Sequence, residues 1–300
     1  MSCEAVATPV DLPLRIGRRT VGRVRRRLVR VSLALEQALA GAGLTLPGLP
    51  PTADGYYLRA VPAALTDGIG AGAGMRRFIR QAYPRHYADL SLGYEAYLDT
   101  FSAKSRSGLK RKRRKLEERC GGTLDVRSYR THAELADFYR KARALSALTY
   151  QERLLDAGLP EGALSEMQSL AESDLVRAFL LFVDSTPVAY LYAPGEGDTL
   201  RYAYLGYAPD FADLSPGTVL QLEAMRMLME EGRFRWFDFT EGDGQHKRQF
   251  ATGAVDSVDM LLLRPTLSNL AVARTLAAWD SIIALAKRIG LKSIAGAVRR

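Results

Sequence analysis

The sequence predicts an α/β protein in which helices flank a mixed, mostly antiparallel sheet. Its 300 residues are 47% hydrophobic and 25% charged, a globular composition with room for two packed cores. Apolar residues recur with a period of two from residue 175 onwards, and segments on both sides show helical spacing. Only two cysteines occur, Cys3 and Cys120, with no His/Cys cluster, so the sequence favours neither a disulfide framework nor a zinc site.

The N-terminal part is expected to be basic and helical. Residues 1–51 combine an Arg-rich run with the apolar stretch Leu33–Ala40 and end in Gly/Pro turns. Residues 52–119 form a second segment, whose helical pattern resumes after Ser107-Gly108 with six consecutive basic residues at Lys110–Lys115. Gly121-Gly122 is a helix stop.

Residues 120–265 are predicted to form the main domain. Thr131 and Glu134 have the spacing of a capping box, which starts a helix through about residue 148. Further expected helices cover residues 161–174, 218–231 and a short stretch from 245, and expected strands cover residues 123–129, 176–184, 187–193, 200–208, 233–240 and 260–263. Residues 266–300 are expected to form C-terminal amphipathic helices.

The turn before the helix at 218–231 is the first candidate site. Ser215-Pro-Gly-Thr218 directly follows the strand–turn region, so it lies at a helix N-terminus. The first N–H groups of a helix lack internal partners and the helix dipole adds positive potential, so this position suits a pyrophosphate. The same residues also form an ordinary helix cap, with Ser215 as N-cap and Pro216 at the first helical position, and the turn alone does not decide between the two.

Four segments resemble a known superfamily: residues 180–190, 204–211, 214–220 and 237–250. They are similar to the GCN5-related N-acetyltransferases (GNAT), and most of all to the BioF2-like or CelD-like acetyltransferase branch, which is related to the FemAB aminoacyltransferases. The resemblance covers about residues 175–255. It implies a GNAT-like acyl-CoA N-acyltransferase fold, preceded by a partial or degenerate second GNAT-like half in residues 52–119.

The resemblance also implies how a donor would bind. Acetyl-CoA or another acyl-CoA would lie between the strands at 200–208 and 233–240. Its pantetheine arm would pair with the backbone of Leu205, Gly206 and Tyr207. Its pyrophosphate would rest at the turn, formed by Ser215, Pro216, Gly217, Thr218 and Val219. No metal is implied.

The candidate catalytic residues follow the second of these strands. Asp238 and Glu241 place acidic groups where an incoming ammonium could be held or deprotonated, or they are merely solvated. His246 stands where relatives often carry a tyrosine, and the resemblance implies that it protonates the departing thiolate; a surface histidine is the alternative. Lys247 either neutralises a phosphate or carboxylate or only flanks a helix.

The net charge of +9 is concentrated in three segments. Residues 1–30, 104–119 and 281–300 carry +6, +7 and +5, so the remainder is acidic. These segments are solvated, or contact an anionic membrane surface, or, under the FemAB relationship, bind tRNA or an anionic acceptor. No motif for sequence-specific nucleic-acid recognition is present. We expect a cytoplasmic location, with peripheral contact at the inner membrane face as an option.

The sequence therefore predicts an acyltransferase. The expected reaction moves an acyl group from acyl-CoA to an amine or hydroxyl of a small-molecule, glycan-precursor or other cell-envelope or exopolysaccharide-related acceptor, by direct attack on the thioester. Two alternatives stay open. One is a FemAB-like transferase that uses aminoacyl-tRNA, and the other is a non-catalytic, membrane-associated component of a polysaccharide-synthesis complex.

Overall fold

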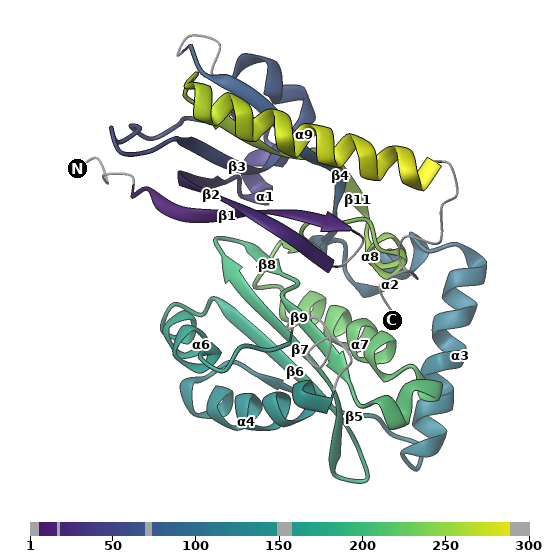
Figure 1. The fold of residues 1–300 in the computed structure, drawn as a ribbon. Coiled ribbons are helices and arrows are strands. Elements are labelled where there is room, and N and C mark those ends of the chain that lie inside the picture. Colours follow the sequence, from purple (N-terminus) through teal and green to yellow (C-terminus); the bar gives the residue numbers. More distant parts are fainter. Residues whose placement is uncertain (1–5, 17–18, 70–73, 149–157, 289–300) are drawn as a thin grey trace, which may run out of the picture. The chain divides into compact units, whose positions relative to one another are not determined.

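The computed structural model describes residues 6–16, 19–69, 74–148 and 158–288, and they fold as two compact units (Figure 1). The first unit combines residues 1–84 with 255–300, and the second is residues 85–254. These boundaries differ from the four consecutive segments expected from the sequence. The chain leaves the first unit inside one strand and returns to it inside another, and no Gly/Pro-rich linker marks either place.

The first unit is a mixed sheet with a long helix. Its strands follow the order β1-β2-β3-β11-β4, with β2 and β3 parallel and β1–β2 and β3–β11 antiparallel. Ala273 and Leu276 of the long helix pack against apolar residues of β1, β2 and β11. The elements are β1 (Thr8–Ile16), β2 (Arg19–Ser32), α1 (Leu35–Leu39), β3 (Gly55–Pro62), η1 (Ala63–Gly68), β4 (Arg76–Asp89), β11 (Gly253–Leu263) and α9 (Leu267–Arg288).

The Arg-rich segment is a strand, so the helix predicted within residues 1–51 is wrong there. β1 and β2 pair as an antiparallel hairpin, and only the short α1 is helical. The physical reason is the content of β-branched residues, such as Val24 and Val31, which favour a strand. In the folded strand, exposed arginines such as Arg23 and Arg25 alternate with less exposed positions. Val21, Val24 and Leu28 are three and four residues apart in the sequence, which is a helical spacing.

A buried carboxylate fixes the middle of this sheet. Asp259 of β11 is 1% exposed, and its oxygens accept hydrogen bonds from the Ala60 N–H, the Gln81 side chain and the Tyr83 hydroxyl, each at 2.9 Å. Ala60 has φ of 55°, in the left-handed region, where the β3–β11 register shifts. The carboxylate therefore holds a β-bulge that would otherwise leave a backbone N–H unpaired.

The second unit carries the predicted helix and strand order. Its sheet runs from the end of β4 through β10, β8, β7, β6 and β5, with β9 also paired to β7. Its elements after β4 are η2 (Leu90–Leu92), α2 (Tyr94–Asp99), α3 (Ala103–Arg119), β5 (Asp125–Tyr129), α4 (His132–Leu148), α6 (Ala163–Glu172), β6 (Val176–Val183), β7 (Thr186–Glu196), β8 (Thr199–Arg201), β9 (Tyr204–Tyr207), η3 (Pro209–Leu214), α7 (Pro216–Glu231), β10 (Trp236–Asp238) and α8 (Gln245–Phe250).

The capping box at the start of α4 is confirmed. The Thr131 N–H donates to Glu134 Oε2 at 2.9 Å, and the Glu134 N–H donates to the Thr131 hydroxyl at 3.4 Å. The Arg130 and Thr131 N–H groups, which both donate to the Glu134 carboxylate, lower its pKa. Two cores lie on opposite faces of the sheet. β7 alternates between them, with Tyr190 and Tyr192 facing α4 and α6, and Leu191 facing α7.

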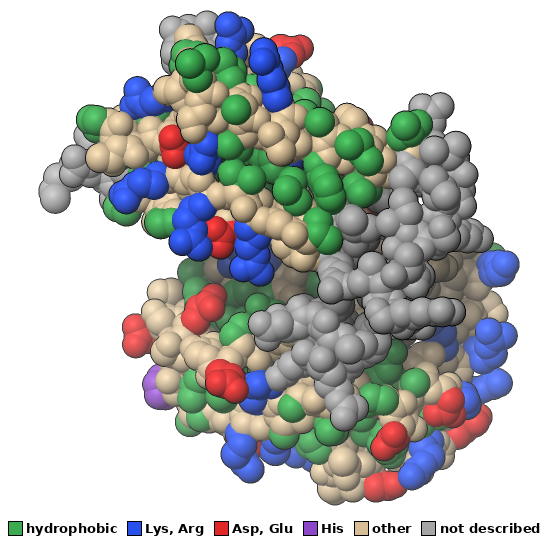
Figure 2. All heavy atoms as spheres, viewed as in Figure 1, with side chains coloured by type: hydrophobic (Ala, Val, Ile, Leu, Met, Phe, Trp, Pro, Cys, Tyr) green, Lys and Arg blue, Asp and Glu red, His purple; other side chains and the backbone are tan. Residues whose placement is uncertain are grey.

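The basic helix α3 runs without a break through Ser107-Gly108, and most of its charge is paired locally. Arg113 pairs with the buried Glu223 of α7 at 2.7 Å. Further ion pairs join Arg106 to Asp99, Arg114 to Glu118, Lys115 to Asp213 and Arg119 to Asp184. Figure 2 shows acidic side chains beside basic ones on the face that it draws. The helix is thus tied to the second unit by its basic side chains.

The C-terminal segment begins as predicted with a helix, α9. Residues beyond 288, including part of the predicted amphipathic region, lie outside the described residues. Ile282 and Leu285 are 60% and 58% exposed. Among the helices that the structure describes, none is both long and apolar enough to cross a membrane.

Candidate functional site

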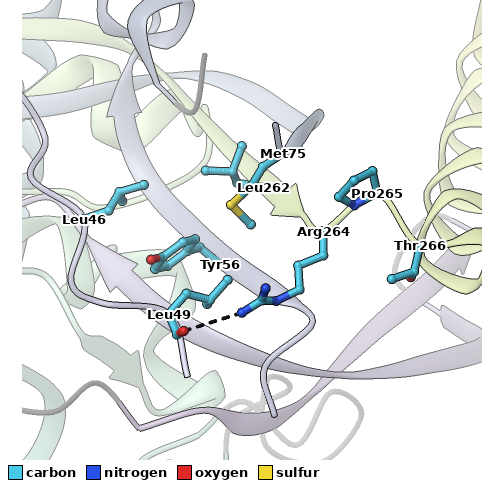
Figure 3. A pocket seen from close by; sticks show the side chains of 8 residues that line it. All are labelled: Leu46, Leu49, Tyr56, Met75, Leu262, Arg264, Pro265 and Thr266. Atoms are coloured by element: carbon cyan, nitrogen blue, oxygen red, sulfur yellow. Dashed lines mark hydrogen bonds between the residues drawn. The ribbon is translucent and has the colours of Figure 1, made fainter. Parts of the chain in front are cut away.

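Two pockets with well-defined walls carry no open reactive group. The first, about 550 Å³ in the first unit, is mostly apolar, and its Arg264 donates to the carbonyls of Leu49, Pro50 and Ala53 (Figure 3). Its Tyr56 hydroxyl donates to the Pro47 carbonyl at 2.5 Å. Both polar side chains are therefore engaged in holding the chain.

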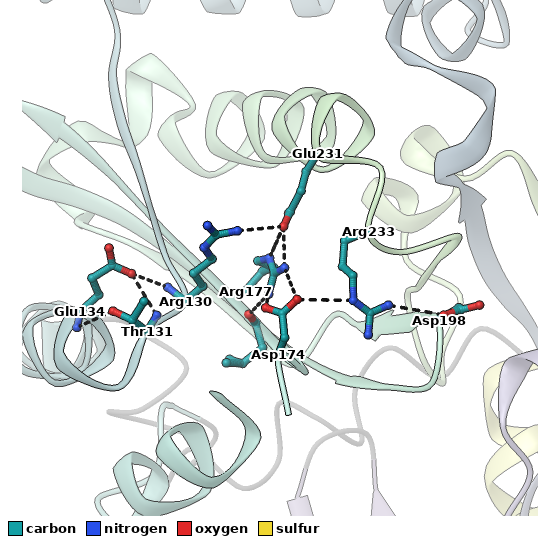
Figure 4. Close-up of polar contacts among 9 residues, drawn as sticks. Arg130, Thr131, Glu134, Asp174, Arg177, Asp198, Glu231 and Arg233 are labelled. Atoms are coloured by element: carbon teal, nitrogen blue, oxygen red, sulfur yellow. Dashed lines mark hydrogen bonds and ion pairs between the residues drawn. The ribbon is translucent and has the colours of Figure 1, made fainter. Parts of the chain in front are cut away.

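The second pocket, about 190 Å³ in the second unit, borders a network of ion pairs. Arg177 is 2% exposed and contacts Asp174 and Glu231, which also pair with Arg233 and Arg130 (Figure 4). Burial of Arg177 lowers its pKa, and hydrogen bonds to the two carboxylates more than offset this, so the net pKa is raised. The network fixes the end of α7 to β6 and leaves no reactive group open.

A better candidate site lies where two parallel strands separate. β8 and β10 pair in parallel over Thr199–Arg201 and Trp236–Asp238, and the Tyr202 N–H still donates to the Asp238 carbonyl at 2.8 Å. Beyond this point β9 pairs with β7 and, among the described strands, with no other. The predicted strand at 200–208 is therefore split into β8 and β9, and the sheet opens between β9 and the end of β10.

Helix α7 connects these diverging strands, so its N-terminus lies at their carboxyl-terminal edge (Figure 1). Open α/β sheets bind ligands at this edge. Ser215 is the N-cap, with φ of 53°, and makes no side-chain capping hydrogen bond. Pro216 follows at the first helical position, as the sequence predicted.

The first turn of α7 leaves one backbone donor open. The Thr218 and Val219 N–H groups both donate to the Ser215 carbonyl, at 3.0 and 3.2 Å. Pro216 has no N–H. The Gly217 N–H donates no hydrogen bond to any residue that the structure describes. Of the amides that the resemblance assigned to a pyrophosphate, Gly217 is thus the one left open.

The glycines of this region are explained by close packing. A Cβ on Gly217 would lie 2.9 Å from Leu205 Cδ2 and 3.2 Å from Tyr207 Cδ1, so α7 contacts β9 through the bare glycine. A Cβ on Gly206 would lie 2.5 Å from the ring of Tyr190, its cross-strand partner. The predicted donor-binding residues Leu205, Gly206 and Tyr207 therefore form β9, directly against the first turn of α7.

The acidic candidates differ in their surroundings. Asp238 ends β10, is 1% exposed, and pairs with the buried Arg85 at 2.6 Å; its Oδ1 also accepts the Thr240 N–H at 2.8 Å. Glu241 is exposed in the following turn. Asp238 thus holds the strand end in place, whereas Glu241 presents its carboxylate at the surface.

His246 and Lys247 lie in the first turns of α8, beside Tyr202. The His246 ring centroid is 5.7 Å from that of Tyr202, which also contacts Phe237 and Phe239. Desolvation by the surrounding protein lowers the pKa of His246, and the positive charge of Lys247 lowers it further. Burial likewise lowers the pKa of Lys247, whose Nζ donates to the Glu241 carbonyl at 2.5 Å.

Two residues that lie near the site were not predicted from the sequence. Tyr202 lies at the point where β8 and β10 part, and burial raises the pKa of its hydroxyl. His86 lies on β4 next to β10, and its Nε2 is 3.1 Å from Asp243 Oδ1. His86 and Arg248 both contact the Asp243 carboxylate and lower its pKa. The long strand β4 was not predicted. Its apolar residues do not alternate in the sequence, and the available indication was its content of strand-favouring residues such as Phe78, Ile79 and Tyr83.

Within the described residues, no group of three or more His, Cys, Asp or Glu side chains is placed to hold a metal ion. The polar groups that this site offers to a ligand are the open Gly217 N–H and the side chains around Tyr202 and His246.

Comparison with known proteins identifies the class. Residues 103–248 match the model of the acetyltransferase (GNAT) domain family. The chain therefore carries a GNAT-type acetyltransferase domain, and the predicted α/β fold, a mostly antiparallel mixed sheet flanked by helices, is confirmed. A comparison with curated proteins gave no match.

Solved structures with a similar fold are distant in sequence. The C-terminal domain (DUF2156) of a putative lysylphosphatidylglycerol synthetase from Agrobacterium fabrum is 13% identical, with a TM-score of 0.52 over 75% of this chain and 72% of that one. FemX is 12% identical, with a TM-score of 0.52 over 86% and 88%. A protein of unknown function from Bacteroides thetaiotaomicron is 12% identical, with a TM-score of 0.50 over 70% of each chain.

Proposed function

We propose that this protein transfers an acyl group from acyl-CoA to an amine or hydroxyl of a cell-envelope or exopolysaccharide-related acceptor. The observation that carries the proposal is the opening of the sheet between β9 and β10, with the N-terminus of α7 and the open Gly217 N–H at the same edge. A helix N-terminus attracts anions, and the Gly217 N–H there has no hydrogen-bond partner among the described residues. The matched GNAT domain spans all of these elements.

In this proposal the donor lies along β9. Its pantetheine arm follows the edge of Leu205–Tyr207 that faces away from β7, where backbone groups can replace a missing strand. Its pyrophosphate meets the first turn of α7, residues 215–219, with the Gly217 N–H as the leading donor. The thioester is then positioned near Tyr202, where β8 and β10 part.

The proposed chemistry is direct aminolysis for an amine acceptor. The acceptor nitrogen attacks the thioester carbonyl, the new C–N bond forms and the C–S bond breaks. The lowered pKa of His246 keeps its imidazole neutral near pH 7, which suits it to accept the proton of the acceptor ammonium. The raised pKa of Tyr202 disfavours its tyrosinate form, so its hydroxyl is suited to pass a proton on: it gives its own proton to the departing thiolate and takes the second proton of the attacking nitrogen. Glu241 attracts the cationic acceptor, and Lys247 attracts anionic groups.

This assignment changes the role that the resemblance implied for His246, from proton donor to proton acceptor. Asp238 contributes by holding the end of β10 through Arg85 and Thr240. We therefore place it as a positioning residue. Its carboxylate is engaged by a guanidinium and a backbone N–H, which leaves it poorly suited to act as a base.

The test is a thermal-shift measurement with acetyl-CoA, longer acyl-CoAs and free CoA. A ligand at a hundredfold excess over its Kd stabilises the protein by about 2.7 kcal/mol. Thr218→Glu should abolish this shift, because it puts a negative charge at the anion position. A carboxylate in the first turn favours the helix itself, so the ligand-free protein should melt no lower than wild type.

Thr218→Gln is the matched neutral control and should retain the shift. Gly217→Glu should also abolish the shift, but the clash of its Cβ with Leu205 and Tyr207 makes Thr218→Glu the cleaner variant. Stabilisation by acyl-CoA that survives Thr218→Glu would move the donor away from α7. Absence of any shift in the wild type would remove acyl-CoA as the donor.

Aminoacyl-tRNA is the second candidate donor, favoured by the fold similarity to FemX and to a lysylphosphatidylglycerol synthetase domain. The basic residues of α3 that lack an ion pair within the described residues would then contact the tRNA; they are the exposed Lys104, Lys110 and Arg111 and the half-buried Lys112. Binding of tRNA that weakens steeply with salt, together with no response to acyl-CoA, would favour this donor.

A further inference from the structure

Gln221 of α7 is a buried polar side chain with unused hydrogen-bonding capacity. It is 3% exposed, and neither its Oε1 nor its Nε2 has a hydrogen-bond partner among the described residues. A buried amide without a partner is costly, and native proteins seldom keep one without a reason. Glu223, two residues further on and equally buried, shows the usual situation, because it pairs with Arg113 and Arg226.

The position of Gln221 directs it toward the donor site. It lies four residues after Gly217, so the two share one face of α7, the face that contacts Leu205 and Tyr207 of β9. In an α-helix each Cα–Cβ bond tilts toward the N-terminus. The Gln221 side chain therefore points back toward the first turn, where Gly217 packs against Leu205 and Tyr207 of β9.

We propose that Gln221 recognises a secondary amide in the arm of the donor, as found in the pantetheine of CoA. This inference rests on the proposed donor site at β9 and α7. A carboxamide offers one acceptor oxygen and two donor hydrogens, so it can pair with both the N–H and the C=O of a secondary amide. A phosphate would leave Oε1 unpaired, and an ammonium would leave Nε2 unpaired. The charged end of an aminoacyl-tRNA presents an ammonium, an ester and ribose hydroxyls, and no secondary amide.

The experiment compares CoA with adenosine 3′,5′-bisphosphate, which is its nucleotide part without the arm and without the second phosphate of the pyrophosphate. Calorimetric titration measures the affinity of CoA and of adenosine 3′,5′-bisphosphate for the wild type, Gln221→Met and Gln221→Glu. Methionine has nearly the same shape and no amide. Gln221→Met should weaken CoA binding about tenfold or more, which is the loss of one or two hydrogen bonds in a buried site. The affinity for the bisphosphate should stay within twofold of wild type.

Two further readouts complete the test. Gln221→Met should raise the melting temperature of the ligand-free protein, because it removes an unpaired buried amide. This increase separates loss of recognition from loss of the fold. Gln221→Glu should weaken CoA binding more than Gln221→Met, because a buried carboxylate adds a negative charge that repels the amide carbonyl and the phosphates of CoA.

The outcomes distinguish a failure of this inference from a failure of the proposed function. Equal CoA affinity of wild type and Gln221→Met would overturn the role of Gln221 and leave the acyl-CoA donor standing. An equal loss for CoA and the bisphosphate would also overturn it, since the effect would then not involve the arm. Failure of the wild type to bind either ligand would overturn the proposed function, and this inference with it.

Discussion

Asp259 in the first unit and Gln221 in the second are both buried polar side chains, yet they differ in what surrounds them. Asp259 accepts three hydrogen bonds from its own unit, whereas Gln221 has no hydrogen-bond partner among the described residues. A tyrosine pair repeats the contrast. The Tyr83 hydroxyl donates to Asp259 at 2.9 Å, and the buried Tyr192 hydroxyl has no hydrogen-bond partner in the described part of the chain.

The difference separates buried polar groups whose hydrogen bonds the fold satisfies from buried polar groups that a ligand could satisfy. A buried group that the fold itself satisfies stabilises the fold, and its removal should be costly. A buried group left unsatisfied costs stability in the free protein, and a ligand that satisfies it recovers that cost. The first unit holds the satisfied kind at its β-bulge. The second unit holds the unsatisfied kind on both faces of the sheet around β7 and β9.

The largest effect is expected for Asp259→Ala. Removing the carboxylate leaves the Ala60 N–H, the Gln81 amide and the Tyr83 hydroxyl without their acceptor. The exposed Gln81 side chain can turn to water, so the cost comes from the other two hydrogen bonds. Hydrogen bonds to a charged group are worth about 1.5–3 kcal/mol each, so the free energy of unfolding should fall by about 4 kcal/mol. Urea unfolding followed by circular dichroism measures it. A loss below about 1 kcal/mol would show that the bulge does not depend on this carboxylate.

Asp238→Asn should have the next largest effect, about 3 kcal/mol. The substitution leaves Arg85, which is 7% exposed at its side chain, without its counter-charge inside the protein. Asp11→Asn is the matched control, because Asp11 pairs with Arg25 at the surface, where ion pairs contribute little. The control should leave the unfolding free energy almost unchanged. Equal effects of the two substitutions would contradict the role given to burial.

How far the sequence predicted the fold depends on the unit. In the second unit the Thr131/Glu134 capping box, the alternating apolar residues of the meander and the Ser-Pro-Gly turn predict α4, β6, β7 and α7 close to their observed bounds. These are local signals, and local structure follows them. In the first unit the apolar residues of the Arg-rich strand β2 do not alternate in the sequence, and β4 was not predicted.

The site was predicted in part for the same reason. Residues 205–207 and 215–219 follow one another in the sequence, so their closeness at the edge of the sheet was expected. The surroundings of Tyr202, His86 and Gln221 depend on how the strands pair and on which polar groups stay unpaired. Both are properties of the folded chain, which a single sequence does not reveal.

His246→Gln tests the candidate site of the second unit through catalysis. If His246 accepts the proton of the acceptor, kcat/KM should rise with pH through its lowered pKa, below about 6.5, and stay level above it. The substitution should lower the rate about a hundredfold and remove this acid limb. His86→Gln is the control, because His86 is already bonded to Asp243. A limb that persists in His246→Gln would assign the base to another residue.

Tyr83→Phe should cost about 2 kcal/mol of unfolding free energy. It removes a hydroxyl that donates to the buried carboxylate of Asp259, and hydrogen bonds to charged groups are worth about 1.5–3 kcal/mol. Chemical unfolding of the variant beside wild type measures the change. A variant as stable as wild type would show that the hydroxyl adds nothing at the bulge.

The same substitution at Tyr192 should have a smaller effect of opposite sign. The Tyr192 hydroxyl is buried against α4 and α6, and burial raises its pKa, so it stays a neutral phenol. Because it has no hydrogen-bond partner among the described residues, Tyr192→Phe should raise the free energy of unfolding by about 1 kcal/mol. The ring, which stacks on Tyr204, is retained. If Tyr192→Phe destabilises the protein as Tyr83→Phe does, the hydroxyl is satisfied within the fold, and the contrast between the two units fails at this position.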